Sequence, residues 1–177
     1  MSHAAHLARV AVLVLAAVLV LGTSKVLSGK SLAGQVVAVP AGVASVSGPS
    51  VRLWENVNNQ GCFSTQRLDV EVTVRLRNGP AAPLRPTAER AGLVIDGRPY
   101  PVSGLQLLTL DAQGRPATAR PDLPPDQSGD VVLVSHAILP KRALSEVDRI
   151  AAWIDLPGGR LRVEIPGLRN VPVRNGR

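Results

Sequence analysis

The chain has 177 residues, 45% of them hydrophobic and only 2% aromatic, which suits one domain of modest size plus an anchor segment. Its formal net charge is +7, but Arg9, Lys25 and Lys30 lie around one apolar run, and the remaining 17 basic and 13 acidic residues leave only +4. So small an excess, with so few aromatic side chains to stack on bases, argues against nucleic acid as a partner.

The N-terminal segment contains an unbroken apolar run at residues 10–21, a pattern typical of a membrane-insertion signal. After a short tail (residues 1–6), we expect residues 7–27 to form a single transmembrane or signal helix. The chain then has a membrane partner through this helix, and the domain that follows lies outside the cytoplasm. Two outcomes stay open: a single-pass anchor in the cell membrane, or a secreted or periplasmic domain after signal cleavage.

Residues 28–49 are small, nearly uncharged and rich in glycine, serine and proline, and we expect them to be a linker. Val36, Val37 and Val39 leave open a first edge strand that stops at Pro40. The folded domain is expected at residues 50–168, followed by a basic C-terminal tail at residues 169–177.

The domain alternates short apolar stretches with turn residues, which predicts antiparallel strands. The clearest strand is residues 68–76, where five apolar residues alternate with four polar ones, so that one face is dry and the other wet. Other strands are expected at residues 51–57, 93–95, 105–110, 131–139, 150–156 and 160–165. One helical turn is expected at residues 143–148, and long proline-containing loops at residues 81–91 and 111–129.

The order of these features resembles the small immunoglobulin-like domains of bacterial membrane-anchored or secreted proteins of unassigned function. The residues that carry the resemblance are a strand ending in Asn78-Gly79, a hairpin around Asp96-Gly97, and a strand that ends at Pro140 before a final hairpin. The resemblance implies an all-β fold, an immunoglobulin-like antiparallel β-sandwich, with an adhesion, scaffold or accessory role. It implies no catalytic residues, and the disulfide of antibody domains is absent because Cys62 is the only cysteine.

We expect a contact surface for another protein at positions outside the hydrophobic core, mostly polar or basic ones. The candidates are the polar loop around Asn58, Cys62 and Phe63, the loop at residues 111–129, and the strand residues Arg160 and Arg162. Cys62 has no neighbouring lysine or histidine in the sequence to lower its pKa, and a half-buried position beside Phe63 is the alternative interpretation.

Catalytic, cofactor and metal residues are not predicted. His136 lies within an apolar strand, which favours a core or sheet-face histidine over a catalytic partner of Ser135 or Cys62. Asp122, Asp126 and Asp130 lie four residues apart, but without the spacing of an EF-hand calcium loop.

These observations predict a membrane-tethered, extracytoplasmic binding or structural module of the cell envelope that contacts another envelope protein and catalyses no reaction. One alternative is an accessory subunit of a larger membrane transport or secretion assembly, in which Ala16, Ala17 and Gly22 allow close helix packing. A second alternative is an envelope enzyme that uses Cys62 or His136.

Overall fold

The computed structural model describes residues 26–58, 65–111, 113–138 and 143–175. The expected transmembrane or signal segment lies almost entirely outside this range, as do Cys62 and Phe63. Among the described helices, none has the length and apolar character needed to cross a membrane.

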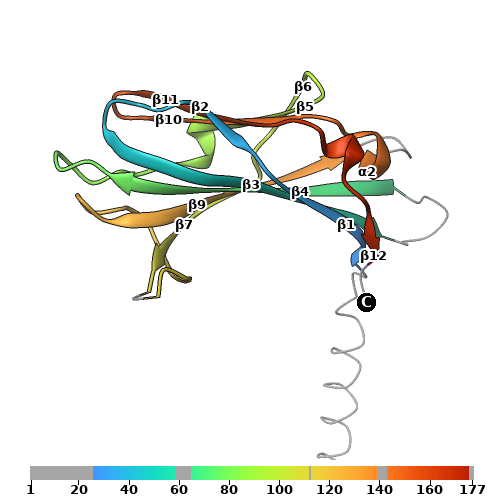
Figure 1. Ribbon diagram of the computed structural model, residues 1–177, viewed down its shortest axis with the longest axis horizontal. Coiled ribbons are helices and arrows are strands. Elements are labelled where there is room, and N and C mark those ends of the chain that lie inside the picture. The colour runs from blue at the N-terminus through green and yellow to red at the C-terminus, as the bar shows by residue number, and fades with distance from the viewer. Residues whose placement is uncertain (1–25, 59–64, 112, 139–142, 176–177) are drawn as a thin grey trace, which may run out of the picture.

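Two antiparallel sheets form the two layers of the fold, and the prediction of an all-β sandwich is confirmed at that level (Figure 1). The lower layer in Figure 1 is a seven-stranded sheet. Its strands, in spatial order, are β12 (Arg174–Asn175), β1 (Val26–Ala33), β3 (Val43–Asn58), β4 (Thr65–Asn78), β9 (Ser128–Ile138), β7 (Gly104–Leu110) and β8 (Pro116–Arg120).

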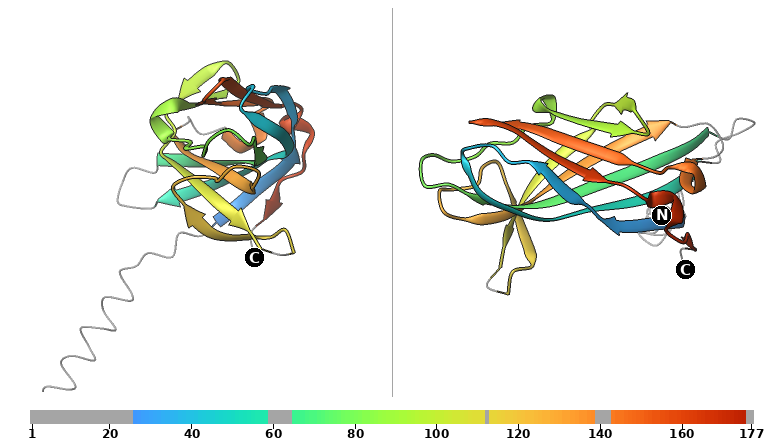
Figure 2. Two further views of the ribbon diagram at one scale, coloured as in Figure 1. Left: turned by 90° about the vertical axis from the view of Figure 1, so that its left-hand side faces the viewer. Right: turned by 45° about the horizontal axis from the view of Figure 1, so that its top comes forward.

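The upper layer is a five-stranded sheet, and two of the short helical turns, α2 (Ala143–Glu146) and η2 (Leu168–Asn170), lie at the same end of the sandwich (Figures 1 and 2). The strands of this sheet are, in order, β2 (Gln35–Ala38), β11 (Gly159–Ile165), β10 (Ile150–Leu156), β5 (Ala91–Ile95) and β6 (Arg98–Tyr100). A further turn is η1 (Ala88–Arg90).

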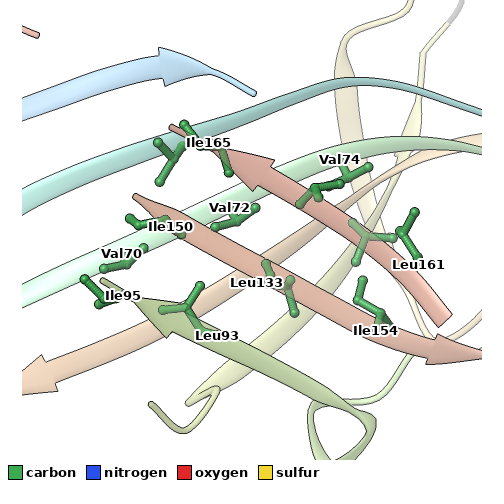
Figure 3. Close-up of a cluster of buried hydrophobic side chains, with 14 of the residues drawn as sticks. Val70, Val72, Val74, Leu93, Ile95, Leu133, Ile150, Ile154, Leu161 and Ile165 are labelled. Carbon is green, nitrogen blue, oxygen red and sulfur yellow. The ribbon is translucent and has the colours of Figure 1, made fainter. Parts of the chain in front are cut away.

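The core lies between the two sheets and is built almost entirely from aliphatic side chains (Figure 3). The alternating pattern at residues 68–76 puts its apolar residues into this core, where Val70 and Val72 are fully buried. They face residues of β10 and β11 across the layers, including Ile150 and Ile165. The predicted strand at residues 150–156 agrees with β10, and the predicted helical turn contains α2.

The expected linker at residues 28–49 is wrong, because this segment forms most of β1, all of β2 and the start of β3. Small residues are what this part of the fold requires. At Gly34 the chain passes from one sheet to the other, and a Cβ there would overlap the Ile165 side chain and lie 2.7 Å from the Glu164 carbonyl oxygen. Val36 and Val37 lie in β2, the edge strand that the linker expectation had left open, and this strand ends at Ala38, one residue before Val39.

Lys30 belongs to the sandwich, although the sequence placed it among the charges beside the apolar run. It is 4% exposed, and its Nζ donates a hydrogen bond to the Leu168 carbonyl oxygen at 3.0 Å. Burial lowers the pKa of Lys30. The basic tail is also partly structured, since β12 pairs with β1 through Ser28–Asn175 and Gly29–Arg174.

The expected loop at residues 111–129 contains β8 and the first residues of β9, so it is not a single loop. Leu84 and Leu123 form an isolated bridge that ties it to the other long loop, and both side chains are buried. The prolines that suggested a loop lie where strands tolerate them: Pro116 is the first residue of β8, and Pro121 follows its last.

The strand order does not identify an immunoglobulin fold. The consecutive strands β3 and β4 form a long hairpin within the seven-stranded sheet, and β2 pairs with β11 in the five-stranded sheet. The description that the structure supports is the broader one, an antiparallel β-sandwich.

Candidate binding surface

The structure does not bring the expected contact residues together. Asn58 ends β3 at the end of the sandwich where β1 begins, as the pairing of Val26 with Asn56 shows. Arg160 and Arg162 lie toward the opposite end, in β11, next to the turn that joins β10 and β11. The predicted surface therefore divides into separate regions, and its members Cys62 and Phe63 lie outside the described residues.

Arg160 is held by an aromatic ring and a carboxylate on the outer face of the five-stranded sheet. Its guanidinium lies 4.1 Å from the centre of the Trp153 ring and bonds both oxygens of Asp155, at 2.7 and 3.1 Å. The hydrogen bond from Arg160 lowers the pKa of Asp155. The Trp153 ring in turn lies directly over Gly92, where a Cβ would overlap the ring.

This cluster offers little unpaired charge to a ligand. Asp155 neutralises Arg160, and Glu164 accepts a hydrogen bond from Arg162 at 2.6 Å. The ring of Trp153 is covered by Arg160 on the solvent side. Sequence reasoning missed Trp153, whose role depends on the cross-strand pairing of Trp153 with Gly92.

The hairpin of β7 and β8 is a projecting part of the sandwich, and we call residues 104–120 the arm (Figures 1 and 2). All five residues of β8 are exposed. The arm is not a loose loop: Arg75 of β4 donates a hydrogen bond to the Gly114 carbonyl oxygen at 3.1 Å and pairs with Asp130 at 2.8 Å. Asp130 raises the pKa of Arg75 by accepting a hydrogen bond from the Arg75 guanidinium.

The tip of the arm is stabilised by a second carboxylate. Asp111 accepts hydrogen bonds from the backbone amides of Gln113 and Arg115, at 2.9 and 2.8 Å, and from Arg115 Nε at 2.8 Å. These hydrogen bonds lower the pKa of Asp111, and the bond from the Arg115 amide contributes most. The arm therefore presents β8 in a defined conformation.

The outer edge of β8 carries backbone groups that no described strand pairs with, because β8 is the last strand of its sheet. The Thr118 carbonyl points toward β7, where it accepts a hydrogen bond from Thr109 Oγ1 at 3.2 Å. Backbone groups of successive strand residues point to opposite sides, so those of Ala119 point to the open side. The register of β7 and β8 shifts between Leu108 and Leu110, toward the tip, and leaves Ala119 opposite Leu108.

The other three edges of the two sheets are blunted by devices that protect natural sheets from unwanted pairing. β12 has two residues, and β6 has three with Pro99 in the middle. β2 has four residues and, like β8, an irregular register with its neighbour. Among the described edge strands, β8 is the longest, and all five of its residues are exposed.

His136 lies on the outer face of the seven-stranded sheet beside a buried carboxylate. Its Nδ1 is 2.6 Å from Oδ1 of Asp69, which is 3% exposed, while the His136 side chain is 39% exposed. The neighbouring Ser135 faces the interior and donates a hydrogen bond to the Pro101 carbonyl oxygen at 2.7 Å. Ser135 and His136 therefore point to opposite faces and do not form a nucleophile–base pair.

Several acidic side chains form ion pairs or hydrogen bonds within the fold. Asp122 pairs with Arg85 at 3.5 Å, and Asp130 pairs with Arg75, so these two candidate calcium ligands are turned to cations. Three more acidic residues, Asp96, Glu146 and Asp148, line an open hollow together with Ser145 and Arg169. Asp96 there accepts hydrogen bonds from the Asp148 and Arg149 amides. Among the described residues, no group of three or more histidine, cysteine or acidic side chains is arranged to hold a metal ion.

Comparisons of the chain with protein-family models, with curated proteins and with solved structures found no match.

Proposed function

We propose that this protein is a non-catalytic binding module of the cell envelope, and that it holds an extended segment of a partner protein along β8. The observation that supports the proposal is the open edge of the arm, which is exposed over all five residues of β8 and held in place by Arg75. A free strand edge recognises another chain through backbone hydrogen bonds, the mode known as strand addition.

The location and tether of the module are further parts of the proposal. The apolar run at residues 10–21 supports an N-terminal membrane helix, with the sandwich outside the cytoplasm. A secreted or periplasmic form after cleavage remains the alternative. The proposal needs only a β-sandwich, and it does not depend on the immunoglobulin-like resemblance.

Photo-crosslinking in the full-length protein in its native membranes tests the binding mode. A photoreactive residue at Ala119 is expected to crosslink to one segment of a partner, and the same probe at Ala117 is expected to react with a neighbouring residue of that segment. The matched control places the probe at Arg98, an exposed residue of the blunted edge strand β6.

Backbone substitution separates strand addition from other contacts. The Ala119→Pro variant removes the outward N–H of residue 119, whereas Ala119→Ser keeps it. We expect the proline variant to lose the crosslink at Ala117 and the serine variant to retain it. Equal crosslinking from Arg98 and Ala117, or an unchanged yield in the proline variant, would overturn the proposal.

A further inference from the structure

We infer that the segment held by β8 alternates apolar and acidic residues. This inference rests on the proposed function, and it concerns the side chains of the partner rather than its backbone. The two faces of the arm differ, and an added strand would place alternate side chains against each face.

One face of the arm offers small and aliphatic side chains. Ala119 lies opposite Leu108, and Leu108 lies opposite Asp130 in the next strand, so these residues share the outer face of the sheet. Leu108 is half-buried and Ala119 is exposed. A methyl group beside a leucine leaves room for an apolar side chain on the added strand, which would bury surface that β8 leaves in water.

The opposite face of the arm offers a cation. Arg120 lies opposite Leu107, a buried core residue, and is itself exposed. It forms no ion pair with any other described residue, whereas Arg75, Arg85 and Arg115 each pair with an aspartate. An acidic side chain on the added strand would supply the missing partner, because opposite charges across a strand pair are favourable and like charges are not.

Three short peptides test this inference by fluorescence anisotropy with the full-length protein in detergent. The first alternates valine with glutamate, the second alternates valine with lysine, and the third is the first with alternate amides N-methylated. We expect the glutamate peptide to bind about three to five times more tightly than the lysine peptide, the size of effect typical of one exposed ion pair. The N-methylated peptide, which lacks half of the strand donors, is expected not to bind.

Charge reversal assigns the preference to one residue. In Arg120→Glu the preference is expected to invert in favour of the lysine peptide. Arg98→Glu changes the net charge by the same amount at the blunted edge and is expected to leave the preference for glutamate intact.

The outcomes separate the inference from the proposed function. If both charged peptides bind equally and both are lost in Ala119→Pro, strand addition stands and the acidic preference is wrong. If Arg98→Glu removes the preference as fully as Arg120→Glu, the preference reflects net charge and the inference is also wrong. If the glutamate peptide binds Ala119→Pro as well as it binds the parent protein, or if no peptide binds, strand addition at β8 fails and the inference fails with it.

Discussion

The two margins of the seven-stranded sheet differ in how far they are covered. At one margin, β1 is covered by β12, and the buried Lys30 side chain reaches across to the carbonyl of fully buried Leu168. At the other margin, β8 is exposed along its whole length, and Arg75 bonds the turn that joins it to β7. The comparison shows that buried contacts lie at one margin and an exposed strand edge at the other. A substitution at one margin therefore need not affect the other.

The largest expected effect is a loss of stability at the covered margin. Leu168→Ala removes a fully buried side chain, and we expect the free energy of unfolding to fall by about 2–5 kcal/mol, measured by urea denaturation. Leu110→Ala, at a half-buried position of the arm, is the matched control and should cost less than about 1.5 kcal/mol. Equal losses would contradict the division between the two margins.

A smaller loss is expected where Arg75 holds the turn between β7 and β8. Arg75→Gln leaves the Asp130 carboxylate, whose side chain is 6% exposed, without its ion pair. Since the Arg75 side chain is 42% exposed, solvent screening limits the cost, and we expect about 1–2 kcal/mol. Hydrogen exchange should accelerate at the amides of residues 113–115, near the Gly114 carbonyl that Arg75 bonds. Unchanged exchange there would show that the arm does not need this anchor.

The smallest effect is expected from Lys30, and its sign is opposite. Lys30→Met removes a buried amine while keeping a side chain of similar length, and the Leu168 carbonyl still accepts a hydrogen bond from the Val171 amide at 3.1 Å. We expect a gain of about 1 kcal/mol at pH 7.

The pH dependence identifies the amine as the cause. Because burial lowers the pKa of Lys30 in the folded protein, the charged form opposes folding, and this penalty disappears as the pH rises from the lowered pKa to the ordinary value of 10.5. The advantage of Lys30→Met over the parent protein should therefore shrink across that interval. A constant advantage at all pH values would assign the gain to packing.

Most strands could be predicted because their side chains alternate. In β4, Val70, Val72 and Val74 point to the core, and the residues between them point outward, so the period itself defines the element. β1 was missed, and β2 was only left open as an alternative to a linker, for the opposite reason. Lys30 breaks the apolar pattern, and Gly34 is needed for a close approach to Ile165 that no local pattern reveals.

The candidate site could be predicted only in part. The first strand of the arm was predicted at residues 105–110, but its second strand, PATAR, was taken as part of a loop because of the prolines around it. Arg160 and Arg162 were correctly placed in a strand. Their ion-pair partners were not predicted, because Asp155 lies in the neighbouring strand and Glu164 lies two residues beyond Arg162. The stack of Arg160 on Trp153 over Gly92 follows from the register of three strands, which the sequence does not specify.

The glycine at which the first strand changes layers also bears on mechanical strength. β1 runs in one sheet, β2 runs in the other, and only Gly34 separates them, with its amide bonded to the Pro49 carbonyl oxygen at 2.7 Å. A force applied at the start of β1 would load the hydrogen bonds between β1 and β3 in shear. It would then act on the pairing of β2 with β11 in the second layer. Such a segment resists unzipping one bond at a time, a property that would suit the tethered, strand-binding module that we propose.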